Sequence, residues 1–189
     1  MRFLSKVGLA GLVVVLAASS ASAQRTVRTS SAAPAVQGGY WELGGDAGVA
    51  IGLDDPKSFS INVPVSQVRA GYYVSDVLSL EPTLRFFSSA TKGFTAFSAW
   101  ALGIGGLYHM SPDRKAMRVF VHPMIGFAGG SGGARTRTSL GAGFGMKKPA
   151  MNGLFHWRME GGLNYLLKNG ALPARTTIYG NFGMSLYTK

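Results

Sequence analysis

From Tyr40 onward, hydrophobic residues alternate with polar or small residues along the chain. A period of two is typical of β-strands that bury or expose one apolar face. Eight such runs can be placed, each of ten or more residues, at 40–51, 63–74, 77–87, 96–108, 117–127, 137–146, 154–166 and 176–187. Segments rich in Gly, Asp, Asn and Pro separate them, as turns require. The pattern predicts an all-β fold with strands longer than the five or six residues usual in globular proteins.

The two faces of these runs differ in a way that favours a barrel with a polar interior. In the run 77–87, Leu80 and Leu84 share one face, whereas Glu81 and Arg85 share the other. The polar faces contain no Lys, and their four carboxylates match four arginines. Charges in a closed interior must be paired, and arginine pairs well with carboxylates. The predicted interior network comprises Glu42, Asp46, Arg69, Glu81, Arg85, Arg118, His122, Arg158 and Glu160.

Small residues occupy the polar face of two runs, at Ala99–Gly105 and Gly141–Gly145. An eight-stranded barrel is only just wide enough for its own side chains. We therefore expect these two walls to make room for long arginine side chains from the other strands.

Aromatic residues lie on the apolar faces, and several fall near the ends of the runs. Such residues form the aromatic girdles of membrane barrels. The predicted girdle comprises Trp41, Tyr72, Trp100, Tyr108, Phe155 and Trp157.

The composition is unusual for a water-soluble domain. Only 14% of the 189 residues are charged, although the formal net charge is +11, and an ordinary domain has about 25% charged residues. The absence of Cys excludes disulfides, thiolate metal sites and cysteine nucleophiles. Much of the basic excess falls in the connecting segments, where it could meet the phosphates of lipopolysaccharide. These bases are Lys57, Lys92, Arg135, Arg137, Lys168 and Arg175.

Residues 1–23 have the features of a secretory signal peptide. Arg2 and Lys6 precede an apolar run, and Ala21-Ser22-Ala23 forms a cleavage site. The apolar run is shorter than the roughly 20 residues of a transmembrane helix. We expect cleavage after Ala23, a flexible periplasmic tail over 24–39, and a barrel over 40–189.

Taken together, the chain resembles the small eight-stranded outer-membrane β-barrels of Gram-negative bacteria, of the OmpA, OmpX and OmpW type. The leader, the eight amphipathic runs and the final segment Ile178–Tyr187 carry the resemblance. Family members usually end on Phe, whereas this chain ends Tyr187-Thr188-Lys189.

The resemblance implies an eight-stranded antiparallel up-and-down transmembrane β-barrel in the bacterial outer membrane. It also implies insertion by the barrel-assembly machinery and a monomer among outer-membrane lipids. An even number of strands places both ends of the barrel chain in the periplasm. The outer loops are then expected at 52–62, 88–95, 128–136 and 167–175. The periplasmic turns are then expected at 75–76, 109–116 and 147–153.

The sequence offers few candidates for chemistry. His109 and Ser111 fall together on an expected turn, and His122 and His156 are expected inside the barrel as hydrogen-bonded residues. The three histidines lack a second zinc ligand at a suitable spacing. The glycine-rich runs open no helix and so should not cradle phosphate. We predict no catalytic site, no metal and no cofactor.

Three functions are compatible with this pattern. The first is a non-enzymatic outer-membrane barrel with a structural role or minor passage of small solutes. The second is an enzyme that modifies lipid A, and the third is a soluble, exported calycin-like barrel that binds an apolar ligand. A pI of about 10.3 is compatible with nucleic-acid binding. However, the basic residues are divided between the two ends of an exported barrel, which disfavours that function. The third function requires Leu80, Leu84, Trp100 and Trp157 to point inward.

Overall fold

The computed structural model describes residues 39–54, 57–89, 97–131, 135–150 and 154–188. The expected signal peptide, most of the expected tail and Lys92 lie outside the described residues.

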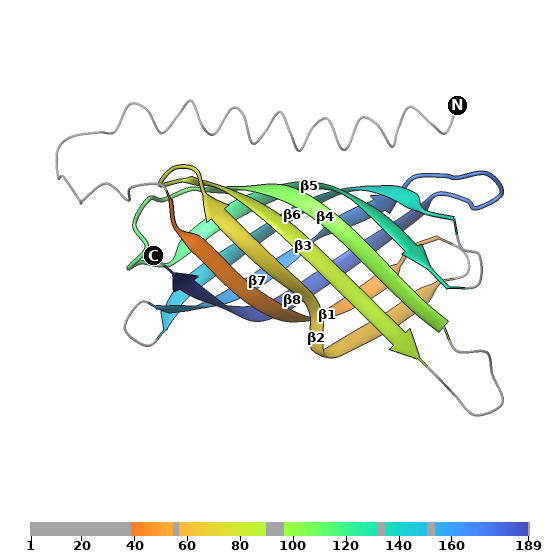
Figure 1. The fold of residues 1–189 in the computed structure, drawn as a ribbon, viewed down its shortest axis with the longest axis horizontal. Coiled ribbons are helices and arrows are strands. Elements are labelled where there is room, and N and C mark those ends of the chain that lie inside the picture. Colours follow the sequence, from red (N-terminus) through yellow and green to blue (C-terminus); the bar gives the residue numbers. More distant parts are fainter. Residues whose placement is uncertain (1–38, 55–56, 90–96, 132–134, 151–153, 189) are drawn as a thin grey trace. The chain divides into compact units, whose positions relative to one another are not determined.

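Eight strands form one closed antiparallel barrel in which each strand pairs with its neighbours in sequence (Figure 1). They are β1 (Trp41–Gly52), β2 (Ser58–Tyr73), β3 (Leu78–Ser89), β4 (Phe97–His109), β5 (Arg118–Gly130), β6 (Arg137–Ala150), β7 (Phe155–Leu166) and β8 (Arg175–Thr188). The barrel closes between β1 and β8, in a continuous register from Trp41 opposite Thr188 to Gly52 opposite Thr177. This confirms the predicted all-β, eight-stranded, up-and-down architecture.

The two ends of the barrel differ in their connections. We call one end the terminal end, because β1 begins and β8 finishes there (Figure 1). The connections from β2 to β3, from β4 to β5 and from β6 to β7 also leave their strands at the terminal end. The connections from β1 to β2, from β3 to β4, from β5 to β6 and from β7 to β8 leave their strands at the loop end.

The outward face of the barrel is almost free of charge. Among the described strand residues that point outward, Lys148 near the terminal end of β6 is the one charged side chain. Large apolar side chains cover the rest, and many stay about half exposed, such as Leu84 (48%) and Phe144 (57%). Leu80, Leu84 and Trp157 point outward, and Trp100 faces Phe86 on the outer surface. The soluble calycin-like alternative is therefore wrong, since its apolar face would point inward.

β2 departs from the prediction near the loop end. It begins at Ser58, five residues earlier than expected, so the loop expected at 52–62 is shorter. Its register against β1 shifts between Asp46, which faces Gln67, and Gly48, which faces Asn62. The pairing of β2 with β3 runs only from Tyr73 to Val68 in the described residues. A bulge of this kind bends the strand and interrupts the backbone ladder.

No helix in the described part of the chain is long and apolar enough to cross a membrane.

Candidate functional site: the polar lumen

Inward-facing side chains are packed most tightly in the terminal-end half of the barrel. Along β4, residues 105, 107 and 109 are buried, whereas the inward residues 99, 101 and 103 keep partial access to solvent. Along β7, His156, Arg158 and Glu160 are buried, whereas Gly162 and Asn164 are partly accessible. On both strands, the inward residues are therefore most fully buried in the terminal-end half.

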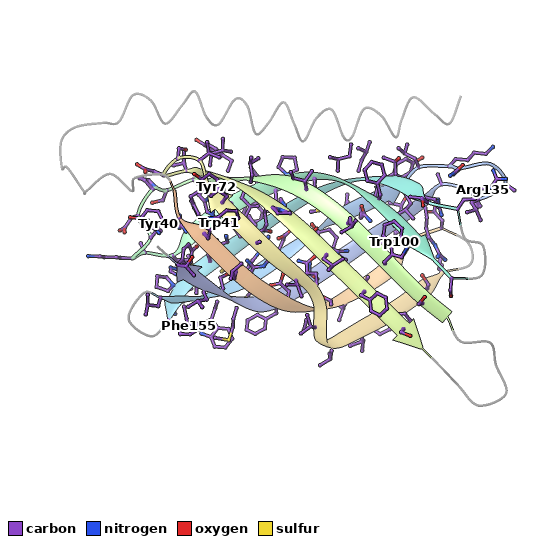
Figure 2. The ribbon with its side chains drawn as sticks, viewed as in Figure 1. Tyr40, Trp41, Tyr72, Trp100, Arg135 and Phe155 are labelled. Carbon is purple, nitrogen blue, oxygen red and sulfur yellow. The ribbon has the colours of Figure 1, made fainter. Side chains whose placement is uncertain are left out.

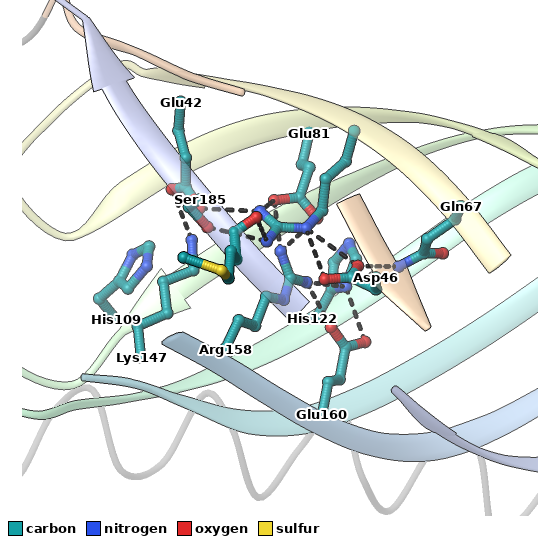
Figure 3. Close-up of polar contacts among 12 residues, drawn as sticks. Glu42, Asp46, Gln67, Glu81, His109, His122, Lys147, Arg158, Glu160 and Ser185 are labelled. Carbon is teal, nitrogen blue, oxygen red and sulfur yellow. Dashed lines mark hydrogen bonds and ion pairs between the residues drawn. The ribbon is translucent and has the colours of Figure 1, made fainter. Parts of the chain in front are cut away.

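Buried ion pairs link neighbouring strands inside the lumen (Figure 3). Arg69 on β2 binds Glu42 at 2.8 Å and Asp46 at 3.0 Å, both from β1. Its Nη2 also donates a hydrogen bond of 2.8 Å to Ser185 Oγ on β8. These residues are fully or almost fully buried, so each charge depends on its partners for solvation.

A second set of ion pairs centres on Arg158 of β7 (Figure 3). Its Nη1 lies 2.6 Å from Glu81 Oε2 on β3, and its Nη2 binds Glu160 on β7. Glu160 also accepts hydrogen bonds from Tyr179 Oη at 2.7 Å and contacts His122 Nδ1 at 3.0 Å. Arg69 Nη1 approaches Glu81 at 3.6 Å, which connects the two sets into one network.

Lys147 belongs to the same network, which corrects the prediction that the interior contains no Lys. The segment 147–153 was expected to be a turn, but β6 continues through Ala150. The Lys147 side chain is buried, and its Nζ lies 2.6 Å from Glu42 Oε2. The described interior therefore holds five basic side chains against four carboxylates, not the predicted four against four.

An aromatic layer fills the terminal end of the lumen, and the sequence analysis missed it. Tyr73, Phe120 and Tyr187 are all buried there. Arg118 Nη2 donates hydrogen bonds of 2.9 Å to the hydroxyls of Tyr73 and Tyr187. Arg118 is thus inside the barrel, but tyrosines rather than carboxylates are its hydrogen-bond partners.

His109 also lies in this layer rather than on the expected turn. It is the last residue of β4, is buried, and stacks on Tyr73 with ring centroids 5.4 Å apart. Its Nε2 is 3.3 Å from the Tyr73 hydroxyl. The Arg114 guanidinium, from the connection that follows, lies 4.0 Å from the Tyr40 ring and extends the layer at the terminal end.

Glycines on the inner walls make room for these side chains, as expected, but not mainly for arginines. A Cβ at Gly105 would collide with the His122 ring, and one at Gly143 would collide with Glu160. Arg69 instead packs against Gly44, where a Cβ would lie 2.5 Å from the guanidinium carbon. The predicted glycine walls on β4 and β6 therefore accommodate the His122 imidazole and the Glu160 carboxylate.

The histidines are not arranged for nucleophilic catalysis. His122 contacts Glu160, His156 Nε2 lies 3.1 Å from the Arg114 carbonyl, and His109 contacts Tyr73. In the described ranges, none hydrogen-bonds a Ser or Thr hydroxyl, the arrangement that activates such a nucleophile. No cluster of metal-binding side chains occurs in the part of the chain that the structure describes.

The predicted girdle residues lie on the outer surface in two groups. Trp41 and Tyr72 lie side by side near the terminal end, Phe155 lies separately at the same end, and Trp100 lies towards the other end (Figure 2). Trp41 and Tyr72 contact each other with ring centroids 5.1 Å apart. Tyr108 faces Leu78 at the terminal end, and Trp157 stacks on Phe182.

The predicted lipopolysaccharide contacts that the structure describes are all at the loop end. Lys57, Arg135 and Lys168 are exposed, whereas Arg137 and Arg175 are partly buried. Arg137 donates hydrogen bonds to the carbonyls of Leu167 and Pro173, so it holds the connection between β7 and β8.

A closed barrel with an apolar, nearly uncharged exterior and an ion-paired interior has the inverted polarity of a transmembrane β-barrel. This fold agrees with the predicted resemblance to small eight-stranded outer-membrane barrels.

Comparison with solved structures returns several chains at low sequence identity. Ail, the attachment invasion locus protein of Yersinia pestis, is 13% identical over 80% of this chain and all of its own, with a TM-score of 0.49. The N-terminal β-barrel domain of Pseudomonas aeruginosa OprF is 15% identical over 80% of this chain and all of its own, with a TM-score of 0.47. A de novo designed protein, TMB2.3, is 16% identical over 82% of this chain and 99% of its own, with a TM-score of 0.38. No protein-family model and no curated protein matches the sequence. The assignment to this fold class therefore rests on the strands and faces of the chain itself.

Proposed function

We propose that this chain is an integral barrel of the Gram-negative outer membrane, with a structural, non-enzymatic role and a lumen closed at its terminal end. In this proposal the terminal end faces the periplasm and the loop end faces outward. The barrel-assembly machinery would insert it through the final strand, and a single chain would suffice. The outward face supports membrane integration most strongly, because Lys148 is its one charged side chain among the described strand residues.

The filled terminal end favours a structural role over the passage of solutes. Tyr73, Leu107 and Phe120 each have no solvent-accessible surface, and they come from three different strands. Next to this layer, the ion pair between Arg158 on β7 and Glu81 on β3 crosses the lumen. A solute would have to displace both layers to pass.

Planar-bilayer recording tests the closed lumen. The purified wild-type barrel should give no current above that of the lipid alone. Replacing Phe120 and Tyr73 together with Ala removes two large side chains from the closed layer, and we expect this variant to give measurable current steps. Steady conductance from the wild type would instead support the passage of small solutes.

Lipopolysaccharide is the proposed partner of the loop end, because its phosphates suit charge-assisted pairing with exposed bases. The variant Arg135→Gln/Lys168→Gln should copurify from the outer-membrane fraction with less lipopolysaccharide than the wild type. The control Lys115→Gln/Lys148→Gln removes the same charge at the terminal end and should leave the amount unchanged. Equal loss in both variants would contradict loop-end binding.

A further inference from the structure

We use the term cup for the inward surface of the loop-end half of the lumen, where many side chains are small. Inward residues Ala50, Ala99, Ala101, Ala128, Ser139 and Gly141 line it, and all remain partly accessible to solvent. These residues come from β1, β4, β5 and β6.

Arg85 stands at the base of the cup without a carboxylate partner. Among the described residues, Arg69, Arg158 and Lys147 each form an ion pair, but Arg85 forms none. Its Nε donates a hydrogen bond of 2.9 Å to Gln67 Oε1. This side-chain bond crosses from β3 to β2 next to Val68, the last β2 residue in the backbone ladder between these strands.

The Arg85 guanidinium extends into the lumen rather than along the wall. Its central carbon lies 5.7 Å from the ring centroid of Tyr179, which belongs to β8 on another wall. No hydrogen bond joins its two terminal nitrogens to any described residue. An arginine presents five N–H donors in a fixed fork, so two nitrogens suited to a bidentate contact remain available.

A neighbouring aromatic residue adds to the recognition surface. Phe87 follows Arg85 on the inward face of β3 and faces Ala99 in register. Although Phe87 points inward, it is 48% exposed. An apolar surface therefore lies next to the Arg85 guanidinium, on the side of the loop end.

Gln67 and Tyr179, the two residues that contact Arg85, also bind carboxylates, and those carboxylates are already matched by other groups. Asp46 is held by Arg69 and Gln67, and Glu160 is held by Arg158, His122 and Tyr179. Arg137 and Arg175 stand at the rim of the cup. Basic groups at a rim and at a base raise the local concentration of anions.

We propose that the cup binds small organic carboxylates that carry a flat apolar body. The carboxylate would accept two hydrogen bonds from the terminal nitrogens of Arg85, in the bidentate geometry that this pair prefers. The apolar body would rest against Phe87 and the alanines of β4. The site lies within the barrel itself, so the proposal goes beyond the structural role and does not depend on it.

Titration of the full, refolded chain in detergent micelles tests this, with benzoate as the probe and isothermal calorimetry as the readout. Arg85→Gln should weaken benzoate binding by about tenfold to a hundredfold, the loss expected for hydrogen bonds to a charged group. Lys57→Gln removes the same charge from the loop end outside the cup and should change binding little. Heat-dependent migration on a gel would show that both variants are folded barrels.

Two further probes separate the parts of the site. Benzamide, which keeps the ring but lacks the charge, should bind more weakly than benzoate, and Phe87→Ala should weaken benzoate while the barrel stays folded. Inorganic phosphate should also bind less well than benzoate, because it lacks the apolar body. Absence of benzoate binding, equal binding by Arg85→Gln, or phosphate binding as tight as benzoate would each overturn the proposal. None of these results bears on where the barrel resides in the cell.

Discussion

Replacing Arg158 with Met is expected to lower the free energy of unfolding by about 3–5 kcal/mol, the usual cost of breaking a buried pair by removing one partner. Arg158 is buried, and it is a partner of both Glu81 and Glu160. Methionine retains part of the apolar stem but leaves those two carboxylates without their main cation. Urea titration of the barrel in lipid vesicles would measure the change.

Arg85→Met is the matched control, because it changes the same residue type on another inward face. Arg85 is partly accessible, and its replacement removes one hydrogen bond to Gln67. The free energy of unfolding should therefore fall by about 1 kcal/mol. Adding Glu81→Gln to Arg158→Met should recover part of the stability, since one unpaired charge disappears. Equal effects of Arg158→Met and Arg85→Met would contradict the assigned network.

Leu84→Arg is expected to destabilise the barrel by about 2–4 kcal/mol, the cost of an arginine on the lipid face at mid-depth. Leu84 lies in the middle of β3, between Val68 and Leu102 on the outer surface. In a water-soluble barrel the same change would be nearly neutral, because 48% of this side chain is already exposed. Unfolding in vesicles of defined thickness measures the cost.

Leu53 provides the control for this experiment. It is exposed to nearly the same extent, at 47%, but lies just beyond β1 at the loop end. Leu53→Arg should therefore cost only about 0–1 kcal/mol, as near a membrane interface. Equal costs at both positions would mean that exposure, and not depth in lipid, determines the effect.

The fold could be predicted from the sequence because the relevant signal is local. Alternation along each strand assigns every side chain to one of two faces, and in a closed barrel those faces become inside and outside. The signal failed at β2, where the bulge beside Asp46 and Gly48 interrupts the alternation and hides the first residues of the strand. The predicted strand ends were also wrong where turn-forming residues belong to the last residues of a strand.

Lys147 and His109 illustrate the second failure. Lys147-Lys148-Pro149 has the composition of a turn, yet the alternation continues from Met146 to Ala150. Following the period of two further would have placed Lys147 inside. Its carboxylate partner, Glu42, is 105 residues away in sequence, and His109 stacks on Tyr73 from another strand. Contacts between distant strands leave no mark on the local pattern.

Tryptophan fluorescence in vesicles of acyl-chain-brominated phosphatidylcholine tests the central claim, that the apolar outer face contacts lipid, most directly. The chain has three tryptophans, Trp41, Trp100 and Trp157, and the alternation of β1, β4 and β7 places all three on that outer face. Bromine quenches fluorescence only on close contact, so we predict strong quenching relative to vesicles of unbrominated lipid. Unchanged fluorescence, together with ready quenching by water-soluble acrylamide, would contradict the membrane-spanning barrel.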